Sequence, residues 1–358
     1  MKKVIVTGGA GFIGSALVRR LVRSGEYEVL NIDKLTYAGN LNSLNELNGN
    51  GFDTFLRGDI CDGAVMAAAF NDFRPNAIFH LAAESHVDRS IDGPELFLQT
   101  NVMGTCTLLK EALRYLRALP GDEARRFRFV HVSTDEVFGD AKGSLRFHER
   151  SPYQPNSPYA ASKASSDHLV RAWGRTFGLP AILTNCSNNY GHFQFPEKLI
   201  PLVIIKCLRG EKIPVYGNGL QVRDWLYVDD HVDALMRIMK RGNPGESYNI
   251  GGDAEVTNLE MVHRICDVLD SIRGRDGVSY RDQIQFVADR PGHDVRYAID
   301  FGKLERTLAW RPRERLESGL AKTVRWYLDN EWWWGPILAR QYSGERLGLL
   351  SERNVTIN

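Results

Sequence analysis

The sequence lacks the features that mark several large classes of protein. No apolar run approaches the roughly 20 residues that a membrane-spanning helix needs, and no internal repeat recurs along the 358 residues. Basic and acidic residues nearly cancel, 45 against 44, so no net field attracts nucleic acid or an anionic membrane. These absences argue against a membrane protein, a repeat array and a nucleic-acid-binding protein. An ordinary hydrophobic content of 43% predicts a globular protein instead.

Cysteine is scarce and scattered. The five cysteines lie at positions 61, 106, 186, 207 and 266 and include no C-x-x-C pair. This spacing predicts reduced thiols, and neither a disulfide framework nor a metal site. The N-terminal "MKKVIVTGGAGFIG" has no A-x-A-like cleavage site after it, and its glycines form a motif of another kind. We therefore expect a cytoplasmic protein that holds no metal.

Short β-branched runs alternate with amphipathic stretches through the first half of the chain. Strands are expected at 3–7, 28–33, 54–60, 77–82, 127–133 and 181–187, and helices at 12–25, 64–73, 95–119 and 157–178. Nearly continuous apolar strands that alternate with helices are typical of a parallel sheet covered on both faces. The predicted fold class is therefore α/β, with a doubly wound, Rossmann-type parallel sheet.

The pattern changes after about residue 190. One helix is expected between proline-marked loops in 193–219, and helices at 258–272 and 319–334 indicate a smaller, mostly helical lobe. Between them, 223–242 and 246–252 are interpreted as a strand, a helix and a strand that return to the main sheet. The expected organisation is a dinucleotide-binding domain at 1–190, joined by 225–252, and an interleaved lobe within 191–358. The asparagine-rich stretch 38–51 is expected to be a short helix and loop, and the three tryptophans at 332–334 are expected to serve packing.

The segment "VTGGAGFIG" (6–14) follows the first expected strand and opens the first expected helix. Gly8, Gly11 and Gly14 recur every three residues, and Gly9, Gly11 and Gly14 also satisfy G-x-G-x-x-G. Glycines allow a tight turn and the close approach of backbone to a pyrophosphate at the helix N-terminus. Asp33 ends the second strand, where its carboxylate can accept from a ribose 2′-hydroxyl and would repel a 2′-phosphate. The sequence therefore predicts NAD in preference to NADP.

Asp59 and Ile60 end the third expected strand. Their position would let them meet the adenine of the dinucleotide. Asp59 could equally be the N-cap of the next helix.

Tyr159 and Lys163 lie four residues apart on an expected helix and therefore share a face. A free tyrosine titrates near about 10, too high for a base at neutral pH. A lysine ammonium and a positive nicotinamide ring would both favour the phenolate and lower that pKa. The pair is thus a candidate proton-transfer couple.

Two acids follow the fifth expected strand directly, in "STDEVFG" (133–139). Ligands bind at the carboxyl ends of parallel strands, so Thr134, Asp135 and Glu136 are candidate site residues. Acids after a strand also commonly cap a turn or face water. A simple dehydrogenase needs one proton-transfer group beside its cofactor, so two further carboxyls indicate a second chemical step.

The Y-x-x-x-K motif after this strand resembles the active-site signature of the short-chain dehydrogenase/reductase superfamily, with Thr134 at the place of its hydroxyl residue. The ordered segments resemble the nucleotide-sugar 4,6-dehydratases of the extended branch of that superfamily. They are "DKLTYAGN", "HLAAESHVDRS", "STDEVFG", "NCSNNYG", "FPEKLIPL", "RDWLYVDDH" and "DRPGHDVRYAID". The resemblance runs from residue 1 to about 334. It departs from the pattern at His192, where proline is expected, and it is looser in the tail "QYSGERLGL".

The resemblance implies a lyase that acts on dTDP-glucose in deoxysugar biosynthesis with NAD as cofactor, as a homodimer. Its reaction is oxidation at C4, elimination of water across C5 and C6, and return of the hydride to C6. In this reaction Tyr159 is the C4 base, Glu136 the C5 base and Asp135 the acid for the C6 hydroxyl. The two acids can divide these roles only if their surroundings push their pKa values apart.

Further contacts are implied by the resemblance alone. Around the cofactor it adds Phe12, Ile13, Lys34, Leu35, Thr36, Leu81, Ala82, Ala83, Ser85, Thr100 and Asn189. Around the substrate it gives Ser85, Thr134, Asn188, Lys198, Leu199, Pro214, Tyr216, Arg223, Asn258, Arg290, His293 and Tyr342. Within this set Arg223, Arg290 and His293 suit the diphosphate.

Two other functions fit parts of the sequence. One is another nucleotide-sugar enzyme of the same fold, such as a 4-epimerase or a decarboxylase. An epimerase has no need of an acid and a base after Thr134. The other is a non-catalytic NAD-binding sensor, which has no reason to keep Tyr159, Lys163, Asp135 and Glu136 together.

Overall fold

The main sheet has seven parallel strands in the computed structural model, which describes residues 1–47, 54–340 and 342. The strands are β1 (Lys2–Thr7), β2 (Tyr27–Asp33), β3 (Phe55–Arg57), β4 (Ala77–His80), β5 (Arg128–Thr134), β6 (Ala181–Cys186) and β10 (Ser247–Ile250). Their order is β10-β6-β5-β4-β1-β2-β3, and every neighbouring pair is parallel. The doubly wound α/β sheet is confirmed, although β3 and β4 are shorter than expected.

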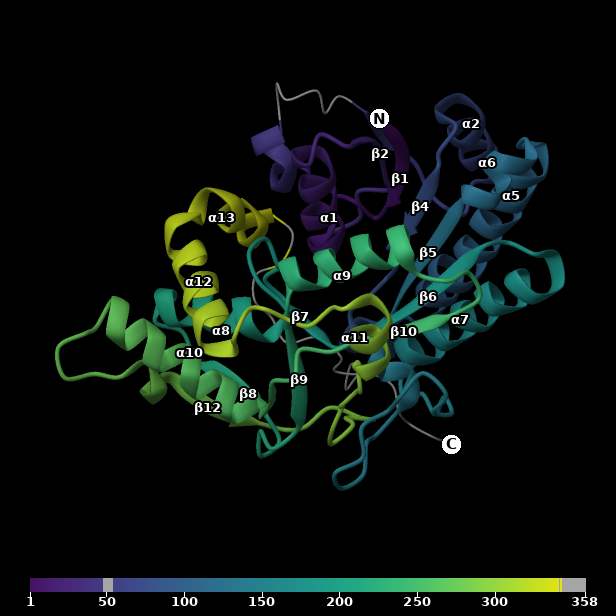
Figure 1. Cartoon of the computed structure of the whole chain (residues 1–358). Coiled ribbons are helices and arrows are strands. Elements are labelled where there is room, and N and C mark those ends of the chain that lie inside the picture. Colours follow the sequence, from purple (N-terminus) through teal and green to yellow (C-terminus); the bar gives the residue numbers. More distant parts are fainter. Residues whose placement is uncertain (48–53, 341, 343–358) are drawn as a thin grey trace, which may run out of the picture.

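Helices cover both faces of this sheet (Figure 1). α1 (Phe12–Arg23) and α9 (Val228–Arg241) lie on one face, and α2 (Gly63–Phe73), α5 (Thr105–Ala118) and α7 (Pro158–Phe177) lie on the other. Successive residues of a strand point to opposite faces. Val4 and Val6 accordingly belong to the core beneath α1 and α9, whereas Ile5 belongs to the core beneath α2, α5 and α7. Burial on both faces explains why these strands are apolar throughout.

The long helix expected at 95–119 is divided. It consists of α4 (Pro94–Phe97), a π-helical segment η2 (Leu98–Gly104) and α5. Two short helices that the sequence did not predict, α3 (Val87–Asp92) and α6 (Gly121–Arg126), flank this region. π-Helical segments are rare and occur often at functional sites.

The smaller lobe packs around a core of its own, to the left in Figure 1. Its helices are α8 (Leu199–Arg209), α10 (Asn258–Ile272), α12 (Leu316–Asp329) and α13 (Glu331–Arg340), and its parallel strand pair is β8 (Ile213–Tyr216) and β12 (Ile284–Val287). Trp333 and Trp334 are buried in this core, as expected, whereas Trp332 is half exposed. The remaining elements are η1 (Leu41–Leu47), η3 (Asp135–Phe138), η4 (Tyr280–Gln283) and α11 (Gly302–Leu308). Residues 48–51 of the asparagine-rich stretch lie outside the described residues.

One expected strand does not join the main sheet. β9 (Val222–Tyr227) pairs instead with β7 (Asn188–Tyr190) and β11 (Glu255–Thr257) in a separate three-stranded sheet. α9 and β10, which follow β9, do return to the main sheet. The prediction for β9 was wrong because the pairing of a short strand depends on distant segments. We propose that the domain containing 1–190 also includes α9 and β10, and that the β7-β9-β11 sheet joins it to the second lobe.

None of the helices in the described part of the chain is long and apolar enough to cross a bilayer.

Candidate active site

A glycine turn connects β1 to α1 as the sequence predicted. Gly8 has φ +75°, and a Cβ there would lie 2.6 Å from the backbone nitrogen of Ala82. A Cβ at Gly14 would overlap the carbonyl oxygen of Gly8. Gly11 is the N-cap of α1 and contributes no capping side chain. The backbones therefore pack closely, and the positive N-terminus of α1 is left for an anionic group.

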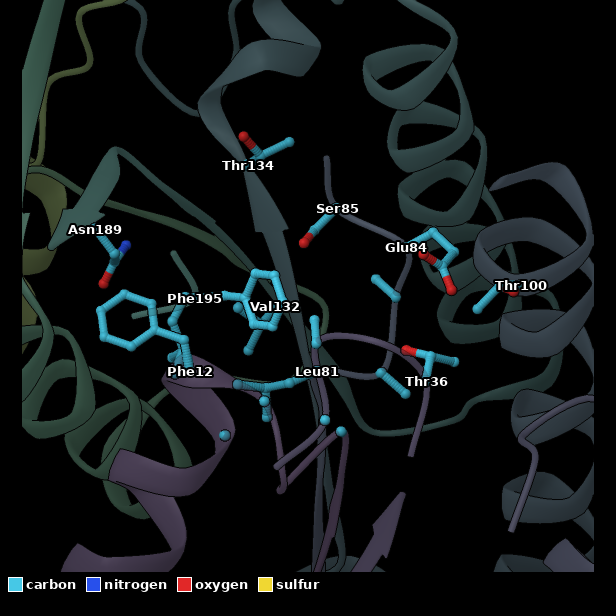
Figure 2. A pocket seen from close by; sticks show the side chains of 18 of the residues that line it. Phe12, Thr36, Leu81, Glu84, Ser85, Thr100, Val132, Thr134, Asn189 and Phe195 are labelled. Carbon is cyan, nitrogen blue, oxygen red and sulfur yellow. The ribbon is translucent and has the colours of Figure 1, made fainter. Parts of the chain in front are cut away.

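A cavity of about 300 Å³ lies where β1 to β6 end. Figure 2 shows Thr134 at the end of a strand, with Asn189 on one side and Thr36, Glu84 and Thr100 on the other. The cavity is lined by most of the residues predicted for the cofactor and the reaction: Gly8, Gly11, Phe12, Ile13, Gly14, Asp33, Lys34, Thr36, Asp59, Ile60, Leu81, Ala82, Ala83, Ser85, Thr100, Thr134, Asp135, Glu136, Tyr159, Lys163, Asn188, Asn189 and Lys198. The fold thus brings together residues that are up to 190 positions apart.

Asp33 is held by backbone donors at the end of β2. Its Oδ2 accepts from the Ala10 amide at 2.9 Å, and its Oδ1 accepts from the Leu35 amide at 2.8 Å. Burial raises the pKa of Asp33, and these two hydrogen bonds oppose that rise. Leu35 itself does not line the cavity and instead contributes this amide with a positive φ of 59°. The carboxylate is thus fixed in orientation at the cavity wall.

Asp59 is not a helix N-cap. The side chain that caps α2 is Asp62, which accepts from the amides of Ala64 and Val65. Asp59 accepts from the Cys61 amide at 2.9 Å and pairs with Lys34 at 2.7 Å. It therefore belongs to the cavity wall.

The loop after β4 is fixed by Asn101, a buried residue of η2 that the sequence analysis missed. Asn101 Nδ2 donates to the Glu84 carbonyl at 3.0 Å and to Ser162 Oγ at 2.8 Å, and its Oδ1 accepts from the Glu84 amide at 2.9 Å. One side chain therefore joins η2, the loop 81–85 and α7. This arrangement presents Thr100, Glu84 and Ser85 to the cavity.

Tyr159 and Lys163 are both buried on α7 and both line the cavity. The pKa of Tyr159 lies well above its ordinary value because of burial and the nearby charge of Glu136, and a hydrogen bond with Thr134 opposes this. Lys163 Nζ donates to the Val132 carbonyl at 2.9 Å, and burial lowers the pKa of Lys163. Burial is thus the largest influence on the pKa of Tyr159, and the expectation that Lys163 and a nicotinamide ring together lower this pKa stays a prediction.

The two acids form the start of η3, whose N-cap is Thr134. Thr134 Oγ1 accepts from the Glu136 amide at 3.2 Å and donates to Asp135 Oδ1 at 3.4 Å. Asp135 is 3% exposed. Asp135 Oδ2 and Glu136 Oε2 are buried and have no hydrogen-bond partner among the described residues. The acids do begin a turn, but they do not face bulk water.

The surroundings of the two acids differ. Burial raises the pKa of Asp135 well above its ordinary range, and the charges of Glu136 and Asp224 raise it further. Burial also raises the pKa of Glu136, but Arg290, Arg223 and Lys198 oppose it. Asp135 is therefore the carboxyl that more strongly favours the proton, and Glu136 is the one that cations help to ionise.

Three predicted substrate residues do not line the cavity but lie near the two acids: Tyr216, Arg223 and Arg290. Asp88, a buried residue of α3, accepts from Arg290 at 2.8 Å and from the Tyr216 hydroxyl at 3.3 Å. Arg223 is buried and stacks over the ring of Tyr297, 4.2 Å from its centroid. Both arginines act electrostatically on Glu136, so this group lies close to the acid pair.

Other predicted substrate residues also lie outside the cavity lining, and among them His293 is close enough to Arg290 and Arg223 for their charges to lower its pKa. His293 Nδ1 is 2.6 Å from Asp289 Oδ1. Leu199 begins α8, Pro214 lies in β8, and Asn258 begins α10. These residues do not line the cavity.

Tyr342 and His192 lie at the edges of this region. Tyr342 is buried in the core of the smaller lobe, with its ring centroid 6.3 Å from that of Phe195. The rest of the tail, residue 341 and residues 343–349, lies outside the described residues. At the position where proline was expected, His192 is 3.8 Å from Asp229, and burial together with Arg19 lowers its pKa to about 3.

Several cavity residues were not predicted. They are Ile32, Ala38, Gly39, Gly58, Val132, Ser133, Cys186, Ser187, Gln194, Phe195 and Glu197. A predicted residue adjoins Ile32, Gly58, Ser133, Ser187 and Glu197, so that neighbour was the available signal. Gln194 and Phe195 had no such signal, because their segment follows β7 and reaches the cavity only through the tertiary fold.

Comparison with known proteins agrees with this geometry. A family model described as GDP-mannose 4,6 dehydratase matches residues 5–323. The dTDP-glucose 4,6-dehydratase of Neisseria meningitidis serogroup B is 56% identical over 352 residues, which cover 97% of this chain and 99% of that protein. The chain belongs to the dTDP-glucose 4,6-dehydratase family. A relative of the same name from Escherichia coli is 53% identical, with 97% of this chain and 99% of that one covered.

Solved structures of this dehydratase family share the fold. The dTDP-glucose 4,6-dehydratase of Streptomyces venezuelae, with NAD bound, has a TM-score of 0.86 and 46% identity, and the match covers 94% of this chain and 99% of that one. The Bacillus anthracis enzyme, also in complex with NAD, has a TM-score of 0.83 and 42% identity over 94% and 100%. A UDP-glucose 4-epimerase from Thermotoga maritima reaches a TM-score of 0.80 at 30% identity over 91% and 99%. The fold is therefore common to dehydratases and epimerases, and side chains must distinguish them.

Proposed function

We propose that the chain converts dTDP-glucose into dTDP-4-dehydro-6-deoxyglucose and water, a step of deoxysugar biosynthesis. The observation that carries this proposal is the pair Asp135 and Glu136, one buried and one half-buried carboxyl with unlike surroundings in the same cavity as Tyr159. The names of its relatives support the substrate. A redox step alone needs the tyrosine, whereas loss of water needs an acid and a base.

The cavity fits NAD. Gly8 and Gly14 leave no room for a Cβ where the backbone meets the α1 N-terminus, and Asp33 presents a fixed carboxylate at the end of β2. That carboxylate suits a ribose with a free 2′-hydroxyl. NAD⁺, when bound, supplies the acceptor for the C4 hydride and the donor that returns it to C6. Its positive ring would also favour the phenolate that burial disfavours at Tyr159.

The protein's own groups move the protons. Tyr159 takes the proton of the C4 hydroxyl, and the C4 ketone that results acidifies the adjacent C5–H. Glu136 removes the C5 proton, and protonated Asp135 donates to the C6 hydroxyl as it leaves as water. Glu136 gives its proton back to C5 when the hydride is returned to C6. Arg223, Arg290 and Lys198 support Glu136 as the carboxylate.

The binding roles carried by the resemblance remain proposals. Ser85, Thr134 and Asn188 would contact the sugar. Arg223, Arg290 and His293 would hold the diphosphate. The charges of Arg223 and Arg290 are close enough to Glu136 to act on its pKa, which supports a diphosphate next to that acid. The nucleotide half of the substrate would be held by Lys198, Leu199, Pro214, Tyr216 and Asn258.

We further infer a homodimer that works in the cytoplasm. Leu96, Leu98 and Met103 in α4 and η2 are each at least half exposed, which is typical of a surface that a second copy covers. All five cysteines are free, and this supports a reducing compartment.

The test is incubation with dTDP-, UDP-, GDP- and CDP-glucose, followed by mass spectrometry. We expect loss of one water from dTDP-glucose, with no NADH accumulating in solution. A product of unchanged mass with inverted C4 configuration would indicate an epimerase instead. NADH released in step with product would contradict the redox-neutral reaction.

A further inference from the structure

Glu197 joins two other segments of the chain at the cavity. Its carboxylate is 1% exposed and accepts from the Tyr37 hydroxyl at 3.0 Å through Oε1 and from Arg89 Nε at 3.0 Å through Oε2. Tyr37 is 160 residues away and Arg89 is 108 residues away. We call these three side chains the Glu197 clasp.

The clasp connects the two walls of the cavity. Tyr37 lies in the loop 34–40 after β2, whose residues Thr36, Ala38 and Gly39 line the cavity on the cofactor side. Glu197 lies in the segment 194–198, which lines the same cavity and precedes α8 of the smaller lobe. The clasp therefore binds a loop of the dinucleotide-binding domain to a segment of the other lobe.

Aromatic contacts support the same connection. The Arg89 guanidinium stacks on the Tyr37 ring, 4.0 Å from its centroid. The Tyr37 ring meets Phe195 edge-on, with 5.4 Å between centroids, and Phe195 lines the cavity. A hydroxyl could thus be removed from Tyr37 without loss of these ring contacts.

The charges around Glu197 are balanced. Burial and the charge of Glu197 raise the pKa of Tyr37, so its hydroxyl stays protonated and donates. His86 Nε2 lies 4.0 Å from Glu197 Oε2, and burial holds the pKa of His86 well below its ordinary value, so the imidazole is neutral. Arg89 supplies the compensating positive charge. Lys198 donates instead to the Ser85 carbonyl at 2.9 Å.

We propose that Glu197 is a positioning residue that fastens the loop 34–40 to the segment 194–198 and so retains NAD in the cavity between turnovers. The proposal rests on the proposed function, because a hydride that is borrowed and returned requires the same cofactor molecule at both steps. The loop that follows Asp33 must shift for a dinucleotide to leave the cavity, and the clasp opposes that shift. Loss of a hydrogen bond to a buried charge should therefore speed this movement of the loop by about tenfold to a hundredfold.

The experiment measures release of the cofactor in the absence of sugar. Wild-type protein, Glu197→Gln, Tyr37→Phe and the double variant are loaded with NADH and mixed with excess NAD⁺, and the decay of protein-bound NADH fluorescence gives the release rate. Tyr115→Phe is the matched control, because it removes a buried hydroxyl that donates to the Pro75 carbonyl at 3.1 Å, away from the cavity.

We expect Glu197→Gln to release NADH about tenfold to a hundredfold faster and Tyr37→Phe about fivefold to tenfold faster. The double variant should be no faster than Glu197→Gln, since both changes break the same link. Tyr115→Phe should release at the wild-type rate.

Wild-type release rates in both Tyr37→Phe and Glu197→Gln would overturn the proposal. If Glu197→Gln does not fold, Tyr37→Phe decides alone, because it keeps the ring contacts. The sugar-nucleotide assay on wild-type protein is independent of these rates. A dehydrating enzyme in which both variants release NADH at the wild-type rate would refute the clasp and leave the proposed function standing.

Discussion

At the scale of single residues, the site depends on how burial and local charge set the pKa values of three neighbouring proton-transfer groups. Tyr159 and Asp135 are buried and Glu136 is half-buried, and burial raises the pKa of each. The positive charges of Arg290, Arg223 and Lys198 oppose this rise at Glu136. This difference lets adjacent carboxyls act as acid and base at one pH.

Replacing Tyr159 by phenylalanine should stop the first step. The ring stays and the phenolate is lost, so neither product nor bound NADH should form when dTDP-glucose is added. General acid–base loss costs about 10²–10⁴-fold in rate. The measurement is nicotinamide absorbance together with product formation, with Tyr115→Phe as the control. Turnover near the wild-type rate would refute the assignment of Tyr159 as the C4 base.

The double variant Asp135→Asn, Glu136→Gln should fail later in the reaction. Oxidation at C4 does not require either carboxyl, so the variant should accumulate enzyme-bound NADH and form about 10²–10⁴-fold less 6-deoxy product. Glu136→Gln alone should slow solvent deuterium entry at C5, whereas Asp135→Asn should affect that exchange less than loss of water. Normal dehydration by the double variant would mean that the acids serve only the turn.

Asp135 should also reduce the stability of the fold as the pH rises. Its folded pKa is raised far above 3.8, so the folded protein holds a proton that the unfolded chain has released. The contribution of Asp135 to the free energy of unfolding is fully present below about pH 4, and it is lost as the pH rises through the folded pKa. Asp135→Asn should therefore stabilise the protein by about 1 kcal/mol at pH 8 and by less at pH 5.

Thermal unfolding at the two pH values measures this difference. The control is Asp72→Asn at an exposed position, which should change stability little at either pH. An Asp135→Asn gain that is equal at pH 5 and pH 8 would contradict a raised pKa.

At the scale of elements, the site is built where parallel strands end, and this part could be predicted from the sequence. Strand and helix periodicity placed the glycine turn, Asp33, Thr134 and Tyr159 at the ends of β1, β2 and β5 and on α7. The helix α10 (Asn258–Ile272) has the bounds that its pattern predicted. What periodicity could not reveal is the π-helical segment η2 inside an apparently continuous helix, because Asn101 takes its role only from contacts with Glu84 and Ser162.

Asn101→Ala should test this element. The change leaves the backbone amide and carbonyl of Glu84 without their side-chain partner, and each buried unsatisfied group costs about 1–3 kcal/mol. We expect destabilisation of about 2–4 kcal/mol, and weaker retention of NAD because Thr100 and the loop 81–85 line its cavity. Chemical denaturation and cofactor content measure the two effects. Asn45→Ala, at an exposed amide, is the control, and equal effects from both variants would contradict the role of Asn101.

At the scale of the whole molecule, pairing between distant segments determined what the sequence could not show. β9 was expected in the main sheet and instead pairs with β7 and β11. A six-residue strand carries too little pattern to specify its neighbour. For the same reason Glu197 was missed, since its contacts with Tyr37 and Arg89 cross between the lobes. The motifs predicted the cofactor half of the site, whereas the contacts between the lobes required the tertiary structure.

The proposed dimer gives the last prediction. Leu98 and Met103 are 50% and 52% exposed in η2, a segment that also carries Thr100 at the cavity. If a second copy covers this surface, Leu98→Glu and Met103→Glu place charges in an apolar interface and, by two-fold symmetry, near their own counterparts. Sedimentation should then show dissociation to monomers at concentrations on the order of a hundredfold above the wild-type value.

Leu145→Glu is the matched control, because Leu145 is 52% exposed outside η2 and should leave the oligomeric state unchanged. Because η2 lies between this surface and the cavity, monomers should also lose cofactor faster than dimers. A wild-type protein that is already monomeric, or charge variants that stay dimeric, would place the interface elsewhere. In that case Leu98 and Met103 would be exposed apolar residues without a partner, which single scattered positions on a surface commonly are.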